Sequence, residues 1–133
     1  YRVLECDDWI EASRFDLVSC LNVLDRCDRP LTFLKDIKKS LKPEAKVIVA
    51  VVLPFKPYVE TGKGWDHKPS ETLTVEGKTF EAQVNSLIAN VFEPNGFTVK
   101  SWTRLPYLCQ GDLHQSYYWL DDAVFVLTLA DKS

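Results

Sequence analysis

Two apolar segments on either side of an amphipathic one constrain this chain more than any other feature. Residues 15–21 (FDLVSCL) and 46–53 (KVIVAVVL) are β-rich runs of strand length, and continuous apolar strands are typical of parallel sheets covered on both faces. The segment between them has one apolar stripe at helical spacing, formed by Leu31, Leu34, Ile37 and Leu41. This order predicts a right-handed parallel crossover, with strand 15–21 at the centre of the sheet.

Capping and turn residues set the expected ends of two helices. Asp28 is expected to cap the first helix, and Pro30 fits its first turn because a proline there sacrifices no intrahelical hydrogen bond. Pro43 is expected to end this helix. A second apolar stripe begins at Phe80, and its helix is predicted to end at Gly96, which can adopt a left-handed cap.

The remaining segments predict further strands and one long loop. Strands are expected at residues 1–5, 70–75, 97–105 and 118–129. The last two must pair antiparallel or sit apart, because no helix separates them, and we expect the antiparallel pair. Residues 54–69 are rich in proline and aromatic side chains and are expected to cover a pocket.

Composition excludes several functional classes. The chain is 46% apolar and 26% charged with a net charge of -3, which gives no reason to expect binding to nucleic acid or to an anionic membrane. The longest apolar run, Val47–Leu53, is far shorter than the ~20 residues that span a bilayer, so no membrane insertion is expected. No CxxC pair occurs among Cys6, Cys20, Cys27 and Cys109. Buried thiols are therefore favoured over a disulfide, and no metal site is expected.

Polar residues directly after strand 15–21 mark the candidate functional site. Asn22 and Asp25 follow this strand before the helix begins. Ligands of open α/β sheets bind outside the carboxyl ends of the strands, so these two side chains are the first candidates for function. Taken alone, Asn22 is also consistent with a turn residue, and Asp25 with a surface ion pair to Arg26.

Several longer motifs resemble a known family. They are the strings SCLNVLDRCDRPLTFLKDI, VVLPFKPYVE, EAQVNSL, TRLPYLCQGD and YYWLDDAVFVL. Together with parallel crossovers that close on an antiparallel pair, they resemble the methyltransferase-like protein 9 (DREV) family of protein-histidine N-pros methyltransferases. The resemblance implies an α/β fold, Rossmann-like and of the class I S-adenosylmethionine-dependent methyltransferases, of which residues 1–133 are the C-terminal part of a single domain.

The resemblance also implies that this chain holds half of a cofactor site. In this fold a Gly-rich turn after the first strand and an acidic residue after the second contact S-adenosylmethionine, and both are expected upstream of Tyr1. The expected partner is therefore the missing N-terminal half of the same domain, and the chain alone is expected to be inactive. The resemblance implies an intracellular location, with the endoplasmic reticulum and mitochondria as candidate compartments, but the sequence itself leaves the compartment open.

Individual residues receive roles from the same resemblance. It places Leu21, Asn22 and Tyr107 beside the cofactor, and Tyr118 beside the substrate histidine. Asp7, Asp8 and Trp9 lie where this fold usually meets the adenine, so a carboxylate there would accept from the exocyclic amine while Trp9 packs on the ring. Without the resemblance, Trp9 and both tyrosines would be ordinary packing aromatics.

The chemistry of histidine methylation suggests roles for three residues. The ring nitrogen nearer the backbone must present a lone pair while the distal nitrogen carries the proton, and a carboxylate that accepts from the distal N–H fixes this tautomer. Asp25 is the candidate for that role. Asn22 offers donors and an acceptor at the junction of cofactor and substrate. With Tyr118 they form the expected catalytic set, and the displacement needs no metal.

The expected function is transfer of a methyl group from S-adenosylmethionine to histidine in His-x-His segments of proteins, leaving S-adenosylhomocysteine. Two alternatives stay open: a methyltransferase of the same fold that acts on another amine or a small molecule, and a non-catalytic module that binds peptides. Asp121 and Asp122 are expected to solvate a turn, although an acidic rim would favour basic peptides. His67 and His114 are expected to be exposed bystanders.

Overall fold

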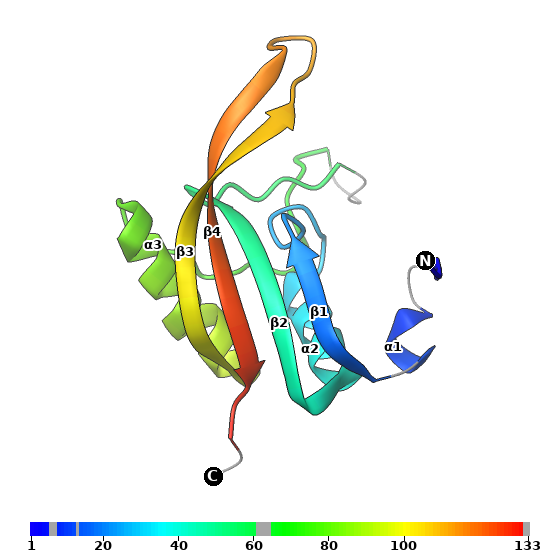
Figure 1. Cartoon of the computed structure of the whole chain (residues 1–133). Coiled ribbons are helices and arrows are strands. Elements are labelled where there is room, and N and C mark those ends of the chain that lie inside the picture. Colours follow the sequence, from blue (N-terminus) through cyan, green and yellow to red (C-terminus); the bar gives the residue numbers. More distant parts are fainter. Residues whose placement is uncertain (6–7, 13, 61–64, 132–133) are drawn as a thin grey trace.

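The computed structural model describes residues 1–5, 8–12, 14–60 and 65–131, which form a mixed sheet with helices packed against it (Figure 1). The elements in chain order are α1 (Trp9–Ala12), β1 (Phe15–Leu21), α2 (Pro30–Ser40), β2 (Leu41–Leu53), α3 (Phe80–Leu87), η1 (Ile88–Phe92), η2 (Glu93–Asn95), β3 (Phe97–Gln110) and β4 (Tyr117–Leu129). None of the helices in these ranges is long and apolar enough to cross a membrane.

The sheet has four strands in the order β1-β2-β4-β3. β1 pairs parallel with β2, with Cys20 opposite Val49, so β1, α2 and β2 form the predicted crossover. β4 pairs antiparallel with both β2 and β3, which confirms the predicted antiparallel final pair. β4 therefore lies between β2 and β3, and the carboxyl ends of β1 and β2 point toward the same edge of the sheet as the start of β4.

Both long helices pack on one face of the sheet (Figure 1). The strands send Val49 and Phe125 into a fully buried core, where they join Leu34 of α2 and Val84 of α3. Phe92 of η1 packs edge-on against Phe125 with ring centroids 4.9 Å apart. The core forms on this face because the alternate residues of β2 and β4 that point to it are almost all apolar.

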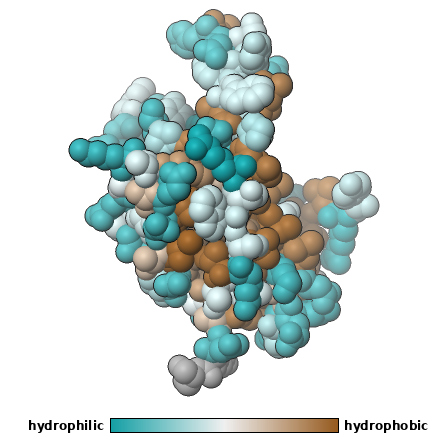
Figure 2. All heavy atoms as spheres, turned by 60° about the vertical axis from the view of Figure 1, so that its left-hand side comes forward, coloured by the Kyte–Doolittle hydropathy of each residue, from teal (hydrophilic) through white to brown (hydrophobic). Residues whose placement is uncertain are grey.

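The opposite face of the sheet carries no helix among the described residues. Leu17 and Leu21 of β1 are 57% and 55% exposed on this side, and Ile48, Val52 and Val126 are half-buried. In the space-filling view, hydrophobic surface (brown) reaches the outside over the middle of the molecule and on the protruding end of the sheet (Figure 2). Folded domains rarely leave a contiguous apolar face of this kind exposed to solvent.

The prediction that β1 lies at the centre of the sheet was wrong for this chain, because β1 is an edge strand. The predicted strands at 1–5 and 70–75 were also wrong, since neither segment forms a strand. A strand needs a neighbour to receive its backbone hydrogen bonds, and no described segment pairs with 1–5 or with the free edge of β1. Leu73 of the second segment is buried, but Tyr1 and Val3 of the first are exposed, so apolar composition predicted neither the burial nor the pairing of residues 1–5.

The ends of the helices follow the predictions in part. α3 is capped by Thr79, whose side chain accepts from the Ala82 N–H at 3.1 Å, and its continuation through η1 and η2 ends at Gly96 with φ 88°, as predicted. α2 begins at Pro30 as predicted but ends at Ser40, before Pro43. The prediction that Asp28 caps α2 was wrong. The N-cap residue is Arg29, whose side chain makes no capping hydrogen bond, and Glu71 accepts from the Thr32 N–H instead.

The last two strands are longer than predicted and extend beyond the rest of the sheet. β3 continues to Gln110, and β4 begins at Tyr117, whereas the last pair between β2 and β4 joins Leu53 and Asp121. Residues 106–120 therefore form a two-stranded hairpin without a third strand, which we call the arm. It projects past the carboxyl end of β2 (Figure 1).

Candidate active site

Asn22 is fixed at the end of β1 by both its backbone and its side chain. Its backbone has φ 57°, a left-handed conformation that asparagine tolerates better than most residues. Its N–H donates to the Ala50 carbonyl of β2 at 2.9 Å. Its side-chain Nδ2 donates to Oδ2 of Asp122 on β4 at 3.1 Å. Contacts from two different strands therefore hold this residue at the carboxyl edge of the sheet.

Asp25 lies in the tight turn after Asn22 and is 6% exposed. Its backbone carbonyl accepts from the Tyr58 N–H at 2.8 Å, and Arg26 Nε lies 3.8 Å from its Oδ2. Burial raises the pKa of the Asp25 carboxyl; the charge of Arg26 partly offsets this, and the charge of Asp122 adds to it. Asp25 and Asp122 are therefore close enough to repel each other.

Three buried oxygen atoms at this place have no hydrogen-bond partner within the described part of the chain. They are Oδ1 of Asn22, Oδ1 of Asp25 and Oδ1 of Asp122. Buried polar atoms are almost always satisfied, so each exception calls for an explanation. All three are acceptors, and two belong to carboxylates. The arrangement is suited to a ligand that carries N–H donors and positive charge.

A groove of ≈ 830 Å³ is lined in part by residues that contact Asp25, although Asn22, Asp25 and Asp122 do not line it themselves. Arg26 and Tyr58 line one side of it, and Cys109, Asp112 and Tyr118 of the arm line the other. The Tyr118 hydroxyl donates to Asp112 Oδ2 at 2.9 Å, and this hydrogen bond raises the pKa of Tyr118. Arg26 and Tyr58 also contact Asp25, so these two residues connect the groove to the buried acceptors.

The wall of the groove that contains Tyr58 is itself braced. The Tyr58 ring stacks on His67 with centroids 4.5 Å apart, and His67 Nδ1 lies 2.9 Å from the Val59 carbonyl oxygen. The Arg26 guanidinium lies 5.7 Å from the centre of the Tyr58 ring. The prediction that His67 is an exposed bystander was therefore wrong: His67 is half-buried and supports the loop. His114 is exposed, as predicted.

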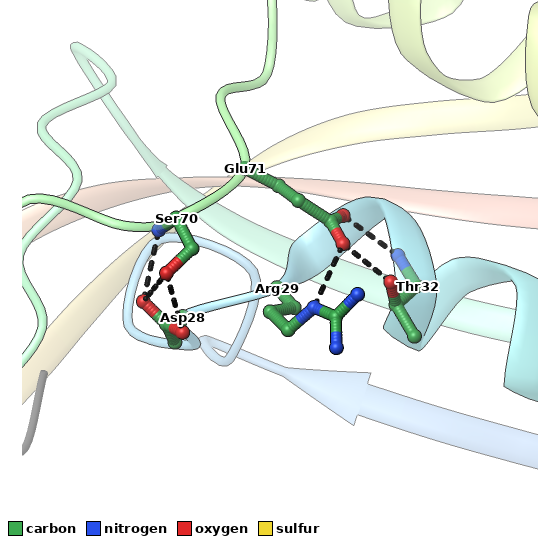
Figure 3. Close-up of polar contacts among 5 residues, drawn as sticks. All are labelled: Asp28, Arg29, Thr32, Ser70 and Glu71. Carbon is green, nitrogen blue, oxygen red and sulfur yellow. Dashed lines mark hydrogen bonds and ion pairs between the residues drawn. The ribbon is translucent and has the colours of Figure 1, made fainter. Parts of the chain in front are cut away.

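A polar clasp ties the long loop to the start of α2 (Figure 3). Asp28 accepts from the Ser70 N–H at 2.8 Å and from the Ser70 hydroxyl. Glu71 accepts from the Thr32 N–H at 2.9 Å, from the Thr32 hydroxyl and from Arg29 Nε at 3.2 Å. Glu71 thus caps α2, and the clasp fixes the loop against the turn that carries Asp25.

The sequence as a whole matches a family model described as DREV methyltransferase over residues 1–129. The chain belongs to the DREV methyltransferase family. Its α/β sheet is that of a class I methyltransferase, and membership identifies S-adenosylmethionine as the cofactor.

One solved structure with a TM-score above 0.5 is similar to this DREV chain in fold. A protein studied for the conversion of a disulfide bond into a thioacetal group during echinomycin biosynthesis superposes with a TM-score of 0.53 at 9% identity, over 91% of this chain and 51% of that protein. LepI in complex with SAM gives a TM-score of 0.43 at 15% identity, over 88% of this chain and 27% of LepI. This chain thus spans about half the length of the echinomycin protein.

The buried acceptors of the DREV chain fit one end of S-adenosylmethionine. The amino-acid portion of this cofactor carries an ammonium group, and its sulfur is cationic, so it suits Oδ1 of Asn22 and Oδ1 of Asp122, two acceptors that have no partner within the described residues. No group of three or more His, Cys, Asp or Glu side chains in the described residues is arranged to hold a metal ion.

The other predicted cofactor residues are spread over the DREV chain. Leu21 is exposed on the uncovered face next to Asn22, and Tyr107 is half-buried on β3, opposite Leu120. Trp9 packs edge-on against Phe33 of α2, with ring centroids 6.0 Å apart, and Asp8 is exposed beside it. Asp7 lies outside the described residues. The structure thus joins Leu21 to the Asn22 cluster but gives Trp9 a packing contact with a helix.

Asp122 is the site residue that sequence reasoning missed. It was expected to solvate a turn, but it is 6% exposed and bonded to Asn22. Burial raises its pKa, and the hydrogen bond from Asn22 partly offsets this. Its neighbour Asp121 is directed elsewhere and pairs with Arg104 at 2.7 Å. A carboxylate inside the apolar run YYWLDDAVFVL was the available signal, since such a residue is buried only for a reason.

The cysteines of the described residues carry free thiols, as predicted, but only Cys20 is buried, and Cys27 and Cys109 are half-buried. Burial raises the pKa of Cys20 to about 12 and that of Cys27 to about 11. Both thiols therefore stay protonated and inert at neutral pH. Cys6 lies outside the described residues.

Proposed function

We propose that the protein containing this chain transfers a methyl group from S-adenosylmethionine to the pros nitrogen of histidine in His-x-His segments of other proteins. The observation that supports this most is the cluster of three buried acceptors that have no hydrogen-bond partner among the described residues and that are connected to a groove through Arg26 and Tyr58. Methyl transfer moves a positive charge from the sulfur of the donor to the imidazole ring. Two carboxylates in a site that excludes water stabilise that charge before and after the transfer.

Asp25 is proposed to orient the imidazole. Its Oδ1 is buried and has no hydrogen-bond partner in the described part of the chain, so it can accept from the distal N–H of a histidine placed between Asp25 and the methyl donor. This hydrogen bond holds the proton on the distal nitrogen and leaves the pros lone pair facing the methyl group. Arg26, on the other carboxylate oxygen, fixes the direction of the Asp25 side chain.

The groove is proposed to hold the substrate chain. Its Glu60 and Asp112 are acidic, which favours histidine-bearing peptides of basic character. Tyr118 lies on its arm wall, with its hydroxyl held by Asp112, and is proposed to contact the substrate histidine. S-adenosylmethionine, when bound, supplies an electrophilic methyl group, and Leu21, Asn22 and Tyr107 are proposed to contact it.

We further propose that residues 1–133 are the C-terminal part of one methyltransferase domain and that an N-terminal half completes it. The uncovered apolar face and the free edge of β1 support this. Leu17 and Leu21 are exposed there although they belong to a strand with the composition of a buried one. A further parallel strand beside β1 and helices on the open face would satisfy both features.

The test uses the intact protein, that is, this chain with the upstream half of its domain. It is incubated with labelled S-adenosylmethionine and His-Ala-His peptides, and the modified nitrogen is located by fragmentation mass spectrometry. We expect pros-methylhistidine. Asp25→Asn should lower kcat by on the order of 100-fold with cofactor affinity kept, and the exposed Asp16→Asn should match the wild type. Methylation of another amine or small molecule instead, or peptide binding without turnover, would contradict the proposal.

A further inference from the structure

Asp122 lies at the point where β4 leaves the body of the sheet. Its register neighbours are Val52 on β2 and Leu105 on β3, so its carboxylate is surrounded by apolar strand positions. It is 6% exposed. One carboxylate oxygen accepts from Asn22, and the other has no hydrogen-bond partner among the residues that the structure describes.

Such a carboxylate is costly to keep in place. Burial disfavours its charged form, and a single hydrogen bond from a neutral amide satisfies only one of its two oxygens. An apolar residue of similar size at this position would continue the strand pattern set by Val124 and Val126. A residue that only packed the sheet would therefore not need to be an acid, and the contact with Asn22 is what distinguishes this position.

The charge of Asp122 decides how the Asn22 amide is oriented. An ionised carboxylate can only accept hydrogen bonds, so the NH2 end of the amide must face it. The backbone of Asn22 is held independently by Ala50, which leaves the amide little freedom other than a flip about its last bond. Because Nδ2 donates to Asp122, the carbonyl Oδ1 faces away from Asp122, and it has no hydrogen-bond partner within residues 1–5, 8–12, 14–60 and 65–131.

We propose that Asp122 is a positioning residue that makes Asn22 present its carbonyl oxygen, and not its NH2 group, to the ligands of the site. Asn22 then recognises a donor, either the ammonium group of the cofactor or a ring N–H of the substrate. A protonated Asp122 could donate to Oδ1 and reverse the amide, which would turn the NH2 group toward the same ligands. The consequence for catalysis rests on the proposed function; the orientation of the amide does not.

The first test compares variants of the intact protein in steady-state methylation. Asp122→Ala should lower kcat/KM by on the order of 100-fold, with no loss of thermal stability. Asp122→Asn keeps an acceptor for Nδ2 and should recover activity to within about tenfold of the wild type. Asp121→Asn is the matched control, because Asp121 is the neighbouring carboxylate and pairs with Arg104; it should stay within about twofold of the wild type.

The second test does not depend on methyl transfer. The side-chain amide signals of Asn22 are followed by 1H–15N NMR from neutral to acid pH in the intact protein. Asp25 faces Asp122 and also titrates, and Arg26 pairs with it, so the experiment is done in an Asp25→Asn background as well. In the wild type and in Asp121→Asn, we expect the Asn22 signals to shift as Asp122 becomes protonated. In Asp122→Asn, we expect these signals not to titrate.

These outcomes separate the inference from the proposed function. Wild-type kinetics in Asp122→Ala, or Asn22 signals that titrate unchanged without Asp122, would overturn the positioning role. If the wild type methylates no histidine peptide while the Asn22 signals still follow Asp122, the proposed function fails and the orientation of the amide stands.

Discussion

Glu71 offers the sharpest test of how the loop is attached to the turn that carries Asp25. Its carboxylate caps α2 from a position far along the chain, because it accepts from the N–H of Thr32, the third residue of the helix. That N–H has no partner within the helix. The Thr32 hydroxyl and Arg29 Nε also donate to it. Glu71→Ala removes all of these interactions at once.

The loss of unfolding free energy expected for Glu71→Ala can be worked out from these contacts. Loss of a side-chain cap destabilises a protein by about 1 kcal/mol, within a range of ~0.5–2. The Arg29 side chain is 66% exposed, so its ion pair adds only ~0.5 kcal/mol. Release of the loop from the clasp adds a similar amount, and we expect Glu71→Ala to lower the free energy of unfolding by about 2 kcal/mol in total.

The stability that Glu71 contributes should depend on pH in a characteristic way. Burial opposes ionisation of Glu71, but the hydrogen bonds from Thr32 and Arg29 outweigh it and lower its pKa. A carboxyl with a lowered folded pKa contributes stability above its unfolded pKa of about 4.3, and this stability is lost as the pH falls through the folded value. The free energy of unfolding of Glu71→Ala should therefore lie furthest below that of the wild type at pH 7, and this difference should become smaller below about pH 4.

Urea denaturation of the intact protein at pH 7 and pH 3.5 measures both effects. Glu76→Ala is the control, since Glu76 lies in the same loop, is exposed, and bonds Ser86 through its backbone N–H. It should change the midpoint little. Equal losses in the two variants at pH 7, or a Glu71→Ala loss that is as large at pH 3.5 as at pH 7, would refute the capping argument.

Three further predictions concern the core and the two buried carboxylates. Phe92→Ala should lower the free energy of unfolding by ~3–5 kcal/mol, because the ring is fully buried against Phe125; thermal denaturation measures it. Burial raises the pKa of Asp25 and of Asp122, so the folded state binds more protons than the unfolded state just above pH 4, and stability should fall there as pH rises. Asp25→Asn should flatten this slope in urea titrations. Asp122→Asn should flatten it too, and a double variant with the slope of the wild type would contradict the assignment.

Local patterns predicted much of the fold. The crossover of β1, α2 and β2 follows from apolar runs and one helical stripe, and the end of the second helix at Gly96 follows from the freedom of glycine to adopt φ 88°. The place of β1 in the sheet could not be predicted in this way. It depends on which strands are present to pair with it, and that is a property of the whole sheet and not of the residues of β1.

In the candidate site too, the residues set by local sequence were predicted and those set by long-range pairing were not. Asn22 and Asp25 could be predicted because a polar residue just after a buried strand lies at a known edge of the sheet. Asp122 was not predicted, because its burial depends on how β4 pairs with β2. Its hydrogen-bond partner Asn22 is 100 residues away in the sequence. The clasp was missed for a similar reason, since Ser70 meets Asp28 across 42 residues.

The arm gives the groove two walls of unequal stiffness. Arg26 lies in the turn between β1 and α2, and Tyr58 lies in the long loop that is hydrogen-bonded to this turn and clasped to α2. Tyr118 and Cys109 lie on a ribbon of two strands that does not pair with β2. Two-stranded ribbons twist and bend more easily than sheets of three or more strands. The width of the groove is therefore adjustable from the arm side, while Asn22 and Asp25 stay in place at the end of β1.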